Sequence, residues 1–323
     1  MIKKQSHRLI KPFLLMAFSL LLITACDQPV SQRHNISLKP SVECRVIQHK
    51  FGETCVPFKP QRIIALAPET SLDPLIALGI KPIGFTSYNF KGEEVHYGVS
   101  FDQVKGAKNV GDVSQPSLEK ILMLKPDLIL SSDRHQYKLL SAIAPSVPVS
   151  YPTNFKMPAN KAFFKETLRY VAKIVGEETK AEEVLNQYNQ RIEELKKRLG
   201  NQLEQIEISV IFYSDGWIGE PMKNVDSIST ILTDMGVHQK FLSPGKYLNI
   251  ETINEFDTDI LFIIDVERKT SSFYFQHPIF SSLKVFKNNR VYFVTPEKWY
   301  TLGISGANKV LDDLFKYLPV SYQ

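Results

Sequence analysis

The sequence of 323 residues lacks the short motifs that mark common catalytic and nucleotide-binding sites. It contains no GxSxG nucleophile elbow, no Walker phosphate loop, no GxGxxG dinucleotide turn and no HExxH zinc helix. The nearest approach, the segment from Gly303 to Gly306, has the wrong spacing for a nucleophile elbow. Adjacent acids such as Asp312 and Asp313 lie in an amphipathic pattern and are expected on a solvated helix face. The sequence therefore predicts no enzymatic chemistry.

Clustered metal ligands are also missing. Six histidines follow the first 26 residues, and no two are closer than thirteen positions: His34, His49, His96, His135, His238 and His277. Ligands need not be neighbours in sequence, so a receptor for a bare zinc or manganese ion stays open as an alternative. No resident metal or other intrinsic cofactor is predicted.

Long hydrophobic runs are absent as well. The apolar stretch Pro12–Ile23 follows four cations and is too short for a comfortable membrane span. Thr24, Ala25 and Cys26 follow this stretch. Cations, then an apolar run, then small residues are the order typical of a secretory signal, and small residues directly before a cysteine resemble the processing box of bacterial lipoproteins. We therefore expect a signal peptide over residues 1–25, lipidation of Cys26 and a flexible tether over 26–43. Asp27 resembles a residue that retains some lipoproteins at the inner membrane, on its periplasmic side.

Excess charge disappears once the signal is removed. Four of the 39 lysines and arginines lie in that segment, leaving 35 against 34 acids. The basic balance of the whole chain is thus no argument for nucleic acid. The remaining 298 residues exceed one ordinary hydrophobic core and suggest two lobes in a monomer.

Cysteine is scarce, with three residues in all. If Cys26 carries lipid, Cys44 and Cys55 remain, and an even pair in an exported chain indicates a disulfide. A pair of metal ligands is the alternative, although no CxxC and no second ligand pair at zinc spacing accompanies it.

Short apolar runs alternate with amphipathic segments along most of the chain. Strands are expected at residues 62–67, 81–85, 127–132, 207–213, 259–265 and 290–294, with helices between them. This alternation predicts an α/β fold with two three-layer lobes, mostly parallel sheets and one long joining helix. The expected lobes are residues 44–157 and 178–323, and the joining helix is residues 158–177.

Ligands of open α/β sheets bind beyond the carboxyl ends of the strands, and here those positions are aromatic and cationic. Arginine binds anionic oxygens through a planar fork of donors, and aromatic faces add packing. A sizeable, oxygen-rich, anionic ligand is therefore expected. The candidate binding residues are Tyr88, Arg134, His135, Tyr213, Trp217, Arg268, Trp299 and Tyr300.

The order of several segments resembles the iron-siderophore receptors of bacterial ABC importers. These segments are PQRIIAL, LIALGIKPIGF, VGDVSQPSLEKILMLKPDLIL, LLSAIAP and LKVFKNNRVYFV. The resemblance runs from about Cys44 to Leu318. The segment CRVIQHKFGETCVP resembles an N-terminal addition in some cyanobacterial members, which supports the disulfide. The resemblance implies a rigid helix between two lobes and a ferric siderophore as ligand.

The resemblance also assigns roles to single residues. Arg134 and Arg268 match cations that face the ligand from the two lobes. A third cation expected after Tyr213 is missing, and Trp217 occupies that neighbourhood with Lys223 a few residues on. This departure disfavours a catecholate and favours a citrate-type hydroxamate or carboxylate siderophore.

Permease docking is expected to use one acid on each lobe. Asp73 stands six residues before Gly79, where the family usually has a glutamate that pairs with the permease. The matching position of the second lobe is Thr233, with Asp234 adjacent.

The chain is thus expected to be a lipid-anchored, substrate-binding protein that delivers a ferric siderophore to a permease and its ATPase. Iron would stay within the siderophore, although Tyr88, His135 or Tyr300 could complete its coordination. The alternatives are a cobalamin or haem receptor of the same importer class and, from another class, a lipid-anchored hydrolase.

Overall fold

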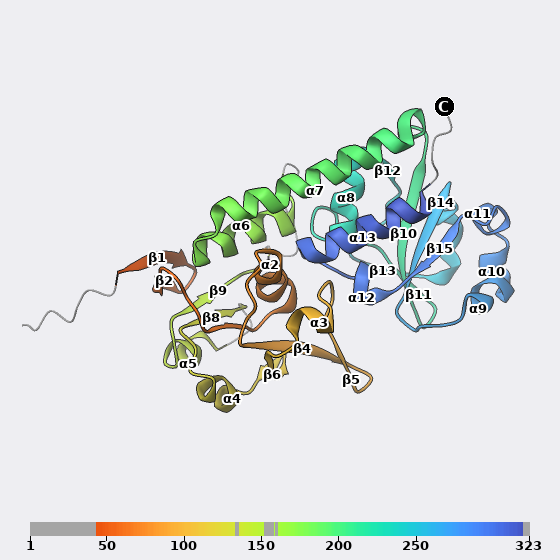
Figure 1. Ribbon diagram of the computed structural model, residues 1–323. Coiled ribbons are helices and arrows are strands. Elements are labelled where there is room, and N and C mark those ends of the chain that lie inside the picture. Colours follow the sequence, from red (N-terminus) through yellow and green to blue (C-terminus); the bar gives the residue numbers. More distant parts are fainter. Residues whose placement is uncertain (1–42, 133–135, 152–157, 159–160, 319–323) are drawn as a thin grey trace, which may run out of the picture. The chain divides into compact units, whose positions relative to one another are not determined.

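The computed structural model describes residues 43–132, 136–151, 158 and 161–318. Two separate β-sheets each carry helices on both faces, and a long helix runs along both groups (Figure 1). The predicted α/β class is confirmed. Within the described residues, no helix combines the length and the apolar character needed to cross a bilayer.

The first sheet is mostly parallel. Its strands in spatial order are β7 (Gln115–Pro116), β6 (Lys108–Asp112), β4 (Gly84–Phe90), β3 (Ile63–Ala65), β8 (Leu128–Ser131) and β9 (Ser146–Pro148), with β5 (Glu93–Val95) antiparallel to β4. Helices α4 (Leu118–Met123) and α5 (Tyr137–Ser141) pack on one face, and α2 (Asp73–Ala77) and α6 (Phe163–Val175) pack on the other. A short helix, α3 (Phe101–Val104), follows β5.

The second sheet has a parallel centre and antiparallel additions. Its strands in order are β13 (Tyr247–Asn249), β11 (Trp217–Gly219), β10 (Glu207–Ser214), β14 (Ile260–Asp265) and β15 (Val291–Val294), with β12 (His238–Gln239) beside β10. Side chains alternate between the faces, so Val210 packs toward one helical layer and Ile211 toward the other. The two layers are α7 (Glu178–Leu199), α8 (Ser227–Met235) and α13 (Ile304–Tyr317), and α9 (Ser271–Gln276), α10 (Pro278–Ser281) and α11 (Lys284–Lys287).

Helices α6 and α7 form an antiparallel pair. Gly176 ends α6 in the left-handed conformation, and the amides of Gly176 and Glu177 both donate to the carbonyl of Ala172. The rings of Phe164 and Tyr188 then meet at 5.3 Å. Helix α7 has 22 residues and is about 33 Å long. The sequence analysis expected the long helix at residues 158–177. That segment contains the shorter helix α6, and the long helix α7 follows it.

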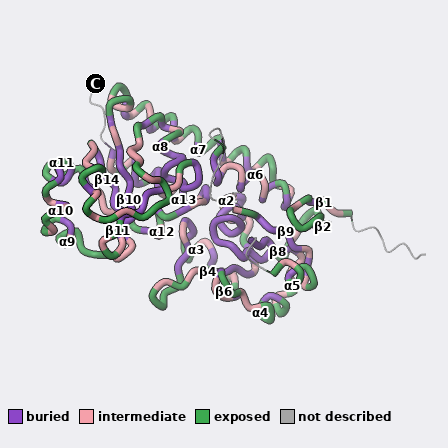
Figure 2. Tube along the Cα trace, turned by 180° about the vertical axis from the view of Figure 1, so that it is seen from behind, coloured by how far each residue is buried: buried purple, intermediate pink, exposed green. Residues whose placement is uncertain are grey.

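One hydrophobic core reaches into both lobes. It joins residues of the first sheet, such as Leu128 and Leu130, with residues of the second, such as Phe262 and Ile264, through α2, α6, α7, α8 and α13. Buried segments accordingly continue from one sheet to the other beneath the long helix (Figure 2). Because protein cores are close-packed, this arrangement resists large rotations of one lobe against the other.

A disulfide closes the hairpin of β1 (Cys44–His49) and β2 (Gly52–Pro57), which confirms the predicted pair Cys44 and Cys55. The hairpin is fixed to both neighbouring layers. The Arg45 guanidinium donates to the carbonyl of Ile174 at 3.0 Å, and the Thr54 hydroxyl donates to the carbonyl of Ser146 at 2.9 Å.

Asp73 of the first lobe caps a helix of the second. Its carboxylate accepts hydrogen bonds from the backbone amides of Ser305 and Gly306, at 3.0 and 3.1 Å, in the first turn of α13. The N-cap residue of α13 is Gly303, which offers no side-chain acceptor of its own. A Cβ on Gly303 would overlap the Asp73 carboxylate, so the close approach requires glycine.

The predicted docking role of Asp73 is wrong, because the residue is 0 % exposed. Its carboxylate supplies acceptors that the start of α13 lacks, and it therefore points inward. Burial raises the pKa of Asp73 to about 6 even though the amide hydrogen bonds and Lys309 act in the opposite direction.

The raised pKa predicts how stability depends on pH. The folded protein holds a proton on Asp73 more tightly than the unfolded chain, so the stabilisation from protonation is present below about pH 4 and is lost as pH rises through about 6. Asp73→Asn does not titrate. Between pH 7.5 and pH 4, the unfolding free energy of wild type relative to this variant should rise by about 2 kcal/mol. Urea unfolding at both pH values measures it, and a constant difference would contradict the burial argument.

Candidate functional site

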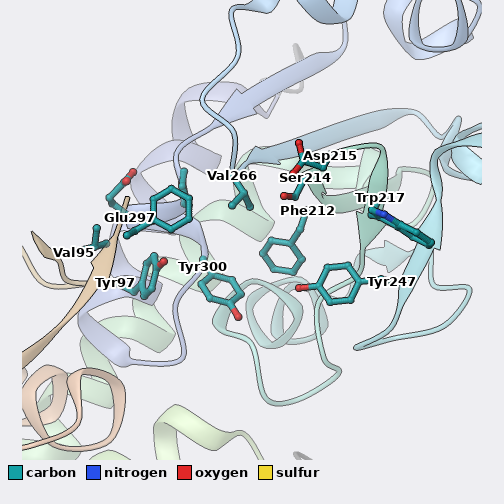
Figure 3. Close-up of a pocket in the computed structure, with 12 residues that line it drawn as sticks. Val95, Tyr97, Phe212, Ser214, Asp215, Trp217, Tyr247, Val266, Glu297 and Tyr300 are labelled. Carbon is teal, nitrogen blue, oxygen red and sulfur yellow. The ribbon is translucent and has the colours of Figure 1, made fainter. Parts of the chain in front are cut away.

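A cavity of about 650 Å³ lies beyond the carboxyl ends of β10, β14 and β15 and beside the β4–β5 hairpin (Figure 3). This is where open α/β sheets bind ligands. Both lobes contribute to its wall. The lining residues are Phe90, Val95 and Tyr97 from the first lobe, and Phe212, Ser214, Asp215, Trp217, Tyr247, Val266, Pro296, Glu297 and Tyr300 from the second.

Four aromatic rings form a continuous series from the first lobe to the second. Tyr88 contacts Tyr97 at 5.3 Å between centroids, Tyr97 meets Tyr300 edge to face at 5.1 Å, and Tyr300 meets Phe212 in the same way at 5.1 Å. Such edge-to-face contacts are favoured by the ring quadrupoles. The series is therefore a contact between the lobes at the floor of the cavity.

Two more aromatic side chains come from neighbouring strands. β11 pairs antiparallel with β13, and Trp217 stands opposite Asn249. Tyr247 lies two positions from Asn249, so it shares a face with Trp217 as its diagonal neighbour. Both are well exposed, at 52 % for Trp217 and 71 % for Tyr247, and they offer ring surface to a ligand.

Two phenol groups of the cavity, those of Tyr97 and Tyr300, have raised pKa values. Burial raises the pKa of Tyr97, and nearby acids add to the shift. Burial likewise raises the pKa of Tyr300. At neutral pH both hydroxyls therefore carry their proton and can donate hydrogen bonds to oxygen atoms of a ligand.

The charged residues of the described wall are acids. Asp215 and Glu297 line the cavity, and none of the described lining residues is a lysine or arginine. Asp215 adopts φ of 47° in the turn between β10 and β11, which Gly216 completes. The sequence predicted cations at these strand ends, so the wall differs from that expectation.

Arg268 lies beside the cavity and is bound by carboxylates on both sides. Its guanidinium donates to Glu93 of the β4–β5 hairpin at 2.9 Å and also to Glu297. A second ion pair runs between the same two segments with the signs exchanged, from Lys91 to Glu267 at 3.6 Å. The two pairs connect the hairpin of the first lobe to the loop after β14 of the second.

Five of the predicted binding residues fall into three groups. Trp217 and Tyr300 line the cavity. Tyr88 lies one ring away from it and donates its hydroxyl hydrogen bond to Glu69 at 2.8 Å. Arg134 and His135 lie outside the described residues.

Trp299 and Tyr213 do not belong to the cavity wall. Trp299 is 0 % exposed, packs on Phe262 at 4.6 Å, and donates its indole N–H to Asp313 at 2.9 Å. Tyr213 is buried against Tyr274 and Phe280 on the opposite face of the sheet. Both side chains follow the usual preference of large aromatics for the core, which is the physical reason for the correction.

Asp234, the second residue predicted for docking, is partly exposed at 26 % of its side chain. Its carboxylate accepts from Lys165 at 2.7 Å and from the Tyr188 hydroxyl at 2.6 Å. These bonds join α8 to α6 and α7. Docking through Asp234 stays a prediction.

Several residues that line the cavity were not predicted from the sequence. In α12 (Pro296–Trp299), Pro296 and Glu297 face the cavity together with Tyr300, while Lys298 pairs with Asp313 behind them. The helical spacing of Pro296 and Tyr300 was a usable signal. Tyr97 and Tyr247 had no such signal, because each depends on a hairpin or strand pairing far away in the sequence.

No group of three or more histidine, cysteine, aspartate or glutamate side chains that could hold a metal ion occurs among the described residues. What the cavity offers a ligand there is aromatic surface, neutral hydroxyls and two carboxylates.

Comparisons with known proteins agree with this arrangement. The sequence pattern of the family described as periplasmic binding protein matches residues 64–298. The chain is 29 % identical over 326 residues to the probable siderophore-binding lipoprotein YfiY of Bacillus subtilis, covering 93 % of this chain and 94 % of that protein. It is also 29 % identical to the Fe(3+)-citrate-binding protein YfmC of the same organism, covering 96 % and 97 %.

The fold agrees with a solved structure as well. A FhuD fold-family periplasmic binding protein of Bacillus subtilis superposes with a TM-score of 0.71 at 24 % identity, covering 84 % of this chain and 99 % of that one.

Substitution of the two tryptophans should change the unfolding free energy by very different amounts. Trp299→Phe removes a buried donor to Asp313 and should lower the unfolding free energy by about 2 kcal/mol, whereas Trp217→Phe should change it by less than about 0.5 kcal/mol. Urea unfolding measures both. In the folded variants, acrylamide should quench the emission of Trp217 strongly and that of Trp299 weakly. Equal quenching would contradict the burial of Trp299.

Proposed function

The chain belongs to the periplasmic binding protein family, and we propose that it captures a ferric siderophore and delivers it to an ABC permease and its ATPase. The resemblance seen in the sequence is confirmed at the level of the family. The observation that carries the proposal is the aromatic cavity formed by both lobes at the carboxyl ends of the strands.

The size of the cavity suits a chelate of this kind. Small-molecule sites usually have about 300 to 1,000 Å³, are mostly apolar, and carry a few polar groups that fix orientation. The cavity of about 650 Å³ fits that description, with Tyr97 and Tyr300 as hydroxyl donors to the outer oxygens of the chelate. The binding of iron within the siderophore requires no metal site of the protein. Tyr88, His135 or Tyr300 could complete an unfilled position on the iron.

Binding without chemistry is the proposed role. The family consists of binding proteins, and release to the permease requires no bond to be broken. The core shared by both lobes favours a modest closure around the ligand over a wide hinge motion. The siderophore is expected to present hydroxamate or carboxylate oxygens.

Tyr300 should be essential for tight binding. Tyr300→Ala removes a ring that contacts both Tyr97 and Phe212 and should weaken the affinity for a ferric siderophore at least about tenfold. The measurement is calorimetry of the purified chain with ferrichrome, ferrioxamine B, ferric citrate, cobalamin and haem, with Trp217 emission as a second signal.

Phe58→Ala is the matched control, since Phe58 is 49 % exposed, does not line the cavity and contacts Arg45 instead. Its affinities should equal those of wild type. Saturable binding of cobalamin or haem alone would replace the siderophore by another ligand of the same class. If folded wild type binds no member of the panel, the proposal fails, and assays for ester and peptide hydrolysis become the next step.

We also propose a lipid anchor at Cys26, supported by the lipoprotein-like signal and by a relative that is named a lipoprotein. Cys26→Ser should move the protein from the membrane fraction to the soluble extracytoplasmic fraction. Fractionation of cells that express either form, followed by immunoblotting, measures this. Membrane retention of the variant at wild-type level would exclude Cys26 as the anchor.

A further inference from the structure

We propose that the cavity selects a ferric chelate that carries no net negative charge and favours one with a cationic group. The inference rests on the proposed function and narrows it. It separates an uncharged or cationic hydroxamate from the carboxylate-rich chelates that the sequence left equally open.

The first argument is the charge of the described wall. Asp215 and Glu297 line the cavity, and no lysine or arginine lies among the described lining residues. Glu93 and Glu267 stand at the rim, where they face Arg268 and Lys91. These described wall and rim residues together comprise four carboxylates and two cations. Walls of one sign focus their field into a cavity, so an anionic ligand is repelled and a cationic one is attracted.

The second argument is the state of Arg268. This side chain was expected to bind an anionic ligand, yet it is held between Glu93 at 2.9 Å and Glu297. An arginine with two carboxylate partners has its charge more than neutralised. Turning it toward an anion would require at least one of these charge-assisted bonds to break.

The third argument is the character of the apolar surface. Trp217, Tyr247 and Tyr300 are 52 %, 71 % and 45 % exposed, and they line the same cavity as Asp215 and Ser214 (Figure 3). Aromatic faces attract ammonium groups, and tryptophan does so best. A carboxylate beside exposed rings is a suitable environment for a pendant amine, and its charge repels a polycarboxylate.

One pair of ligands with the same iron-binding groups, compared with two anionic chelates, tests the proposal. Ferrioxamine B carries a protonated amine, and its N-acetyl derivative lacks that charge. Ferric citrate and ferric enterobactin are anionic. In calorimetry with the full chain, both hydroxamates should bind at least about tenfold more tightly than either anion, and ferrioxamine B more tightly than its acetyl derivative. Added salt should weaken the binding of ferrioxamine B alone among the hydroxamates.

Asp215→Asn should reduce the preference for ferrioxamine B over its acetyl derivative while leaving the affinity for the derivative nearly unchanged. The double substitution Glu93→Gln with Glu297→Gln should release Arg268 and raise the affinity for ferric citrate by about tenfold. Glu194→Gln with Glu255→Gln makes the same change in net charge at exposed positions away from the cavity and should have no such effect.

The outcomes separate this inference from the proposed function. Tight binding of an anionic chelate, equal to or above that of the hydroxamates, would overturn the charge preference and leave siderophore capture intact. Equal affinity for ferrioxamine B and its acetyl derivative would remove the cationic preference. Failure of a folded wild-type chain to bind any of the chelates would overturn siderophore capture itself.

Discussion

The hydrogen bonds from the start of α13 to the Asp73 carboxylate are the constraint on which the arrangement of the two lobes depends. An aspartate on a helix of the first lobe supplies the acceptors that a helix of the second lobe lacks, since Gly303 at its N-cap has no side chain. The carboxylate is fully buried, and burial therefore disfavours its charged form. It is retained because two backbone amides would otherwise be left without acceptors.

The cavity depends on the same junction. Tyr300 and Glu297 lie a few residues before Gly303, so the cap fixes the segment that supplies them to the cavity. The contact of Tyr300 with Tyr97 then joins the lobes a second time at the cavity floor. The binding surface is thus largely formed before a ligand arrives, which lowers the ordering cost of binding.

The sequence was sufficient for the parts of the fold that depend on local patterns. The apolar runs at residues 207–213 and 259–265 became β10 and β14, and α8 is a helix between them, as expected. The site was harder to predict, because position after a strand does not determine which way a side chain points. Trp217 turned toward the cavity and Trp299 toward the core, although both follow apolar runs. Arg268 was recognised as a cation, but its two carboxylate partners lie 175 and 29 residues away.

The hairpin of β1 and β2 stands where the chain enters the fold, and its disulfide joins the first residue of β1 to a residue near the end of β2. A pull on the preceding segment reaches Cys44 and crosses directly to Cys55. The backbone of the ten residues between the two cysteines therefore does not transmit this force. Arg45 and Thr54 within this loop can therefore keep their bonds to Ile174 and Ser146 when a force enters the hairpin through Cys44.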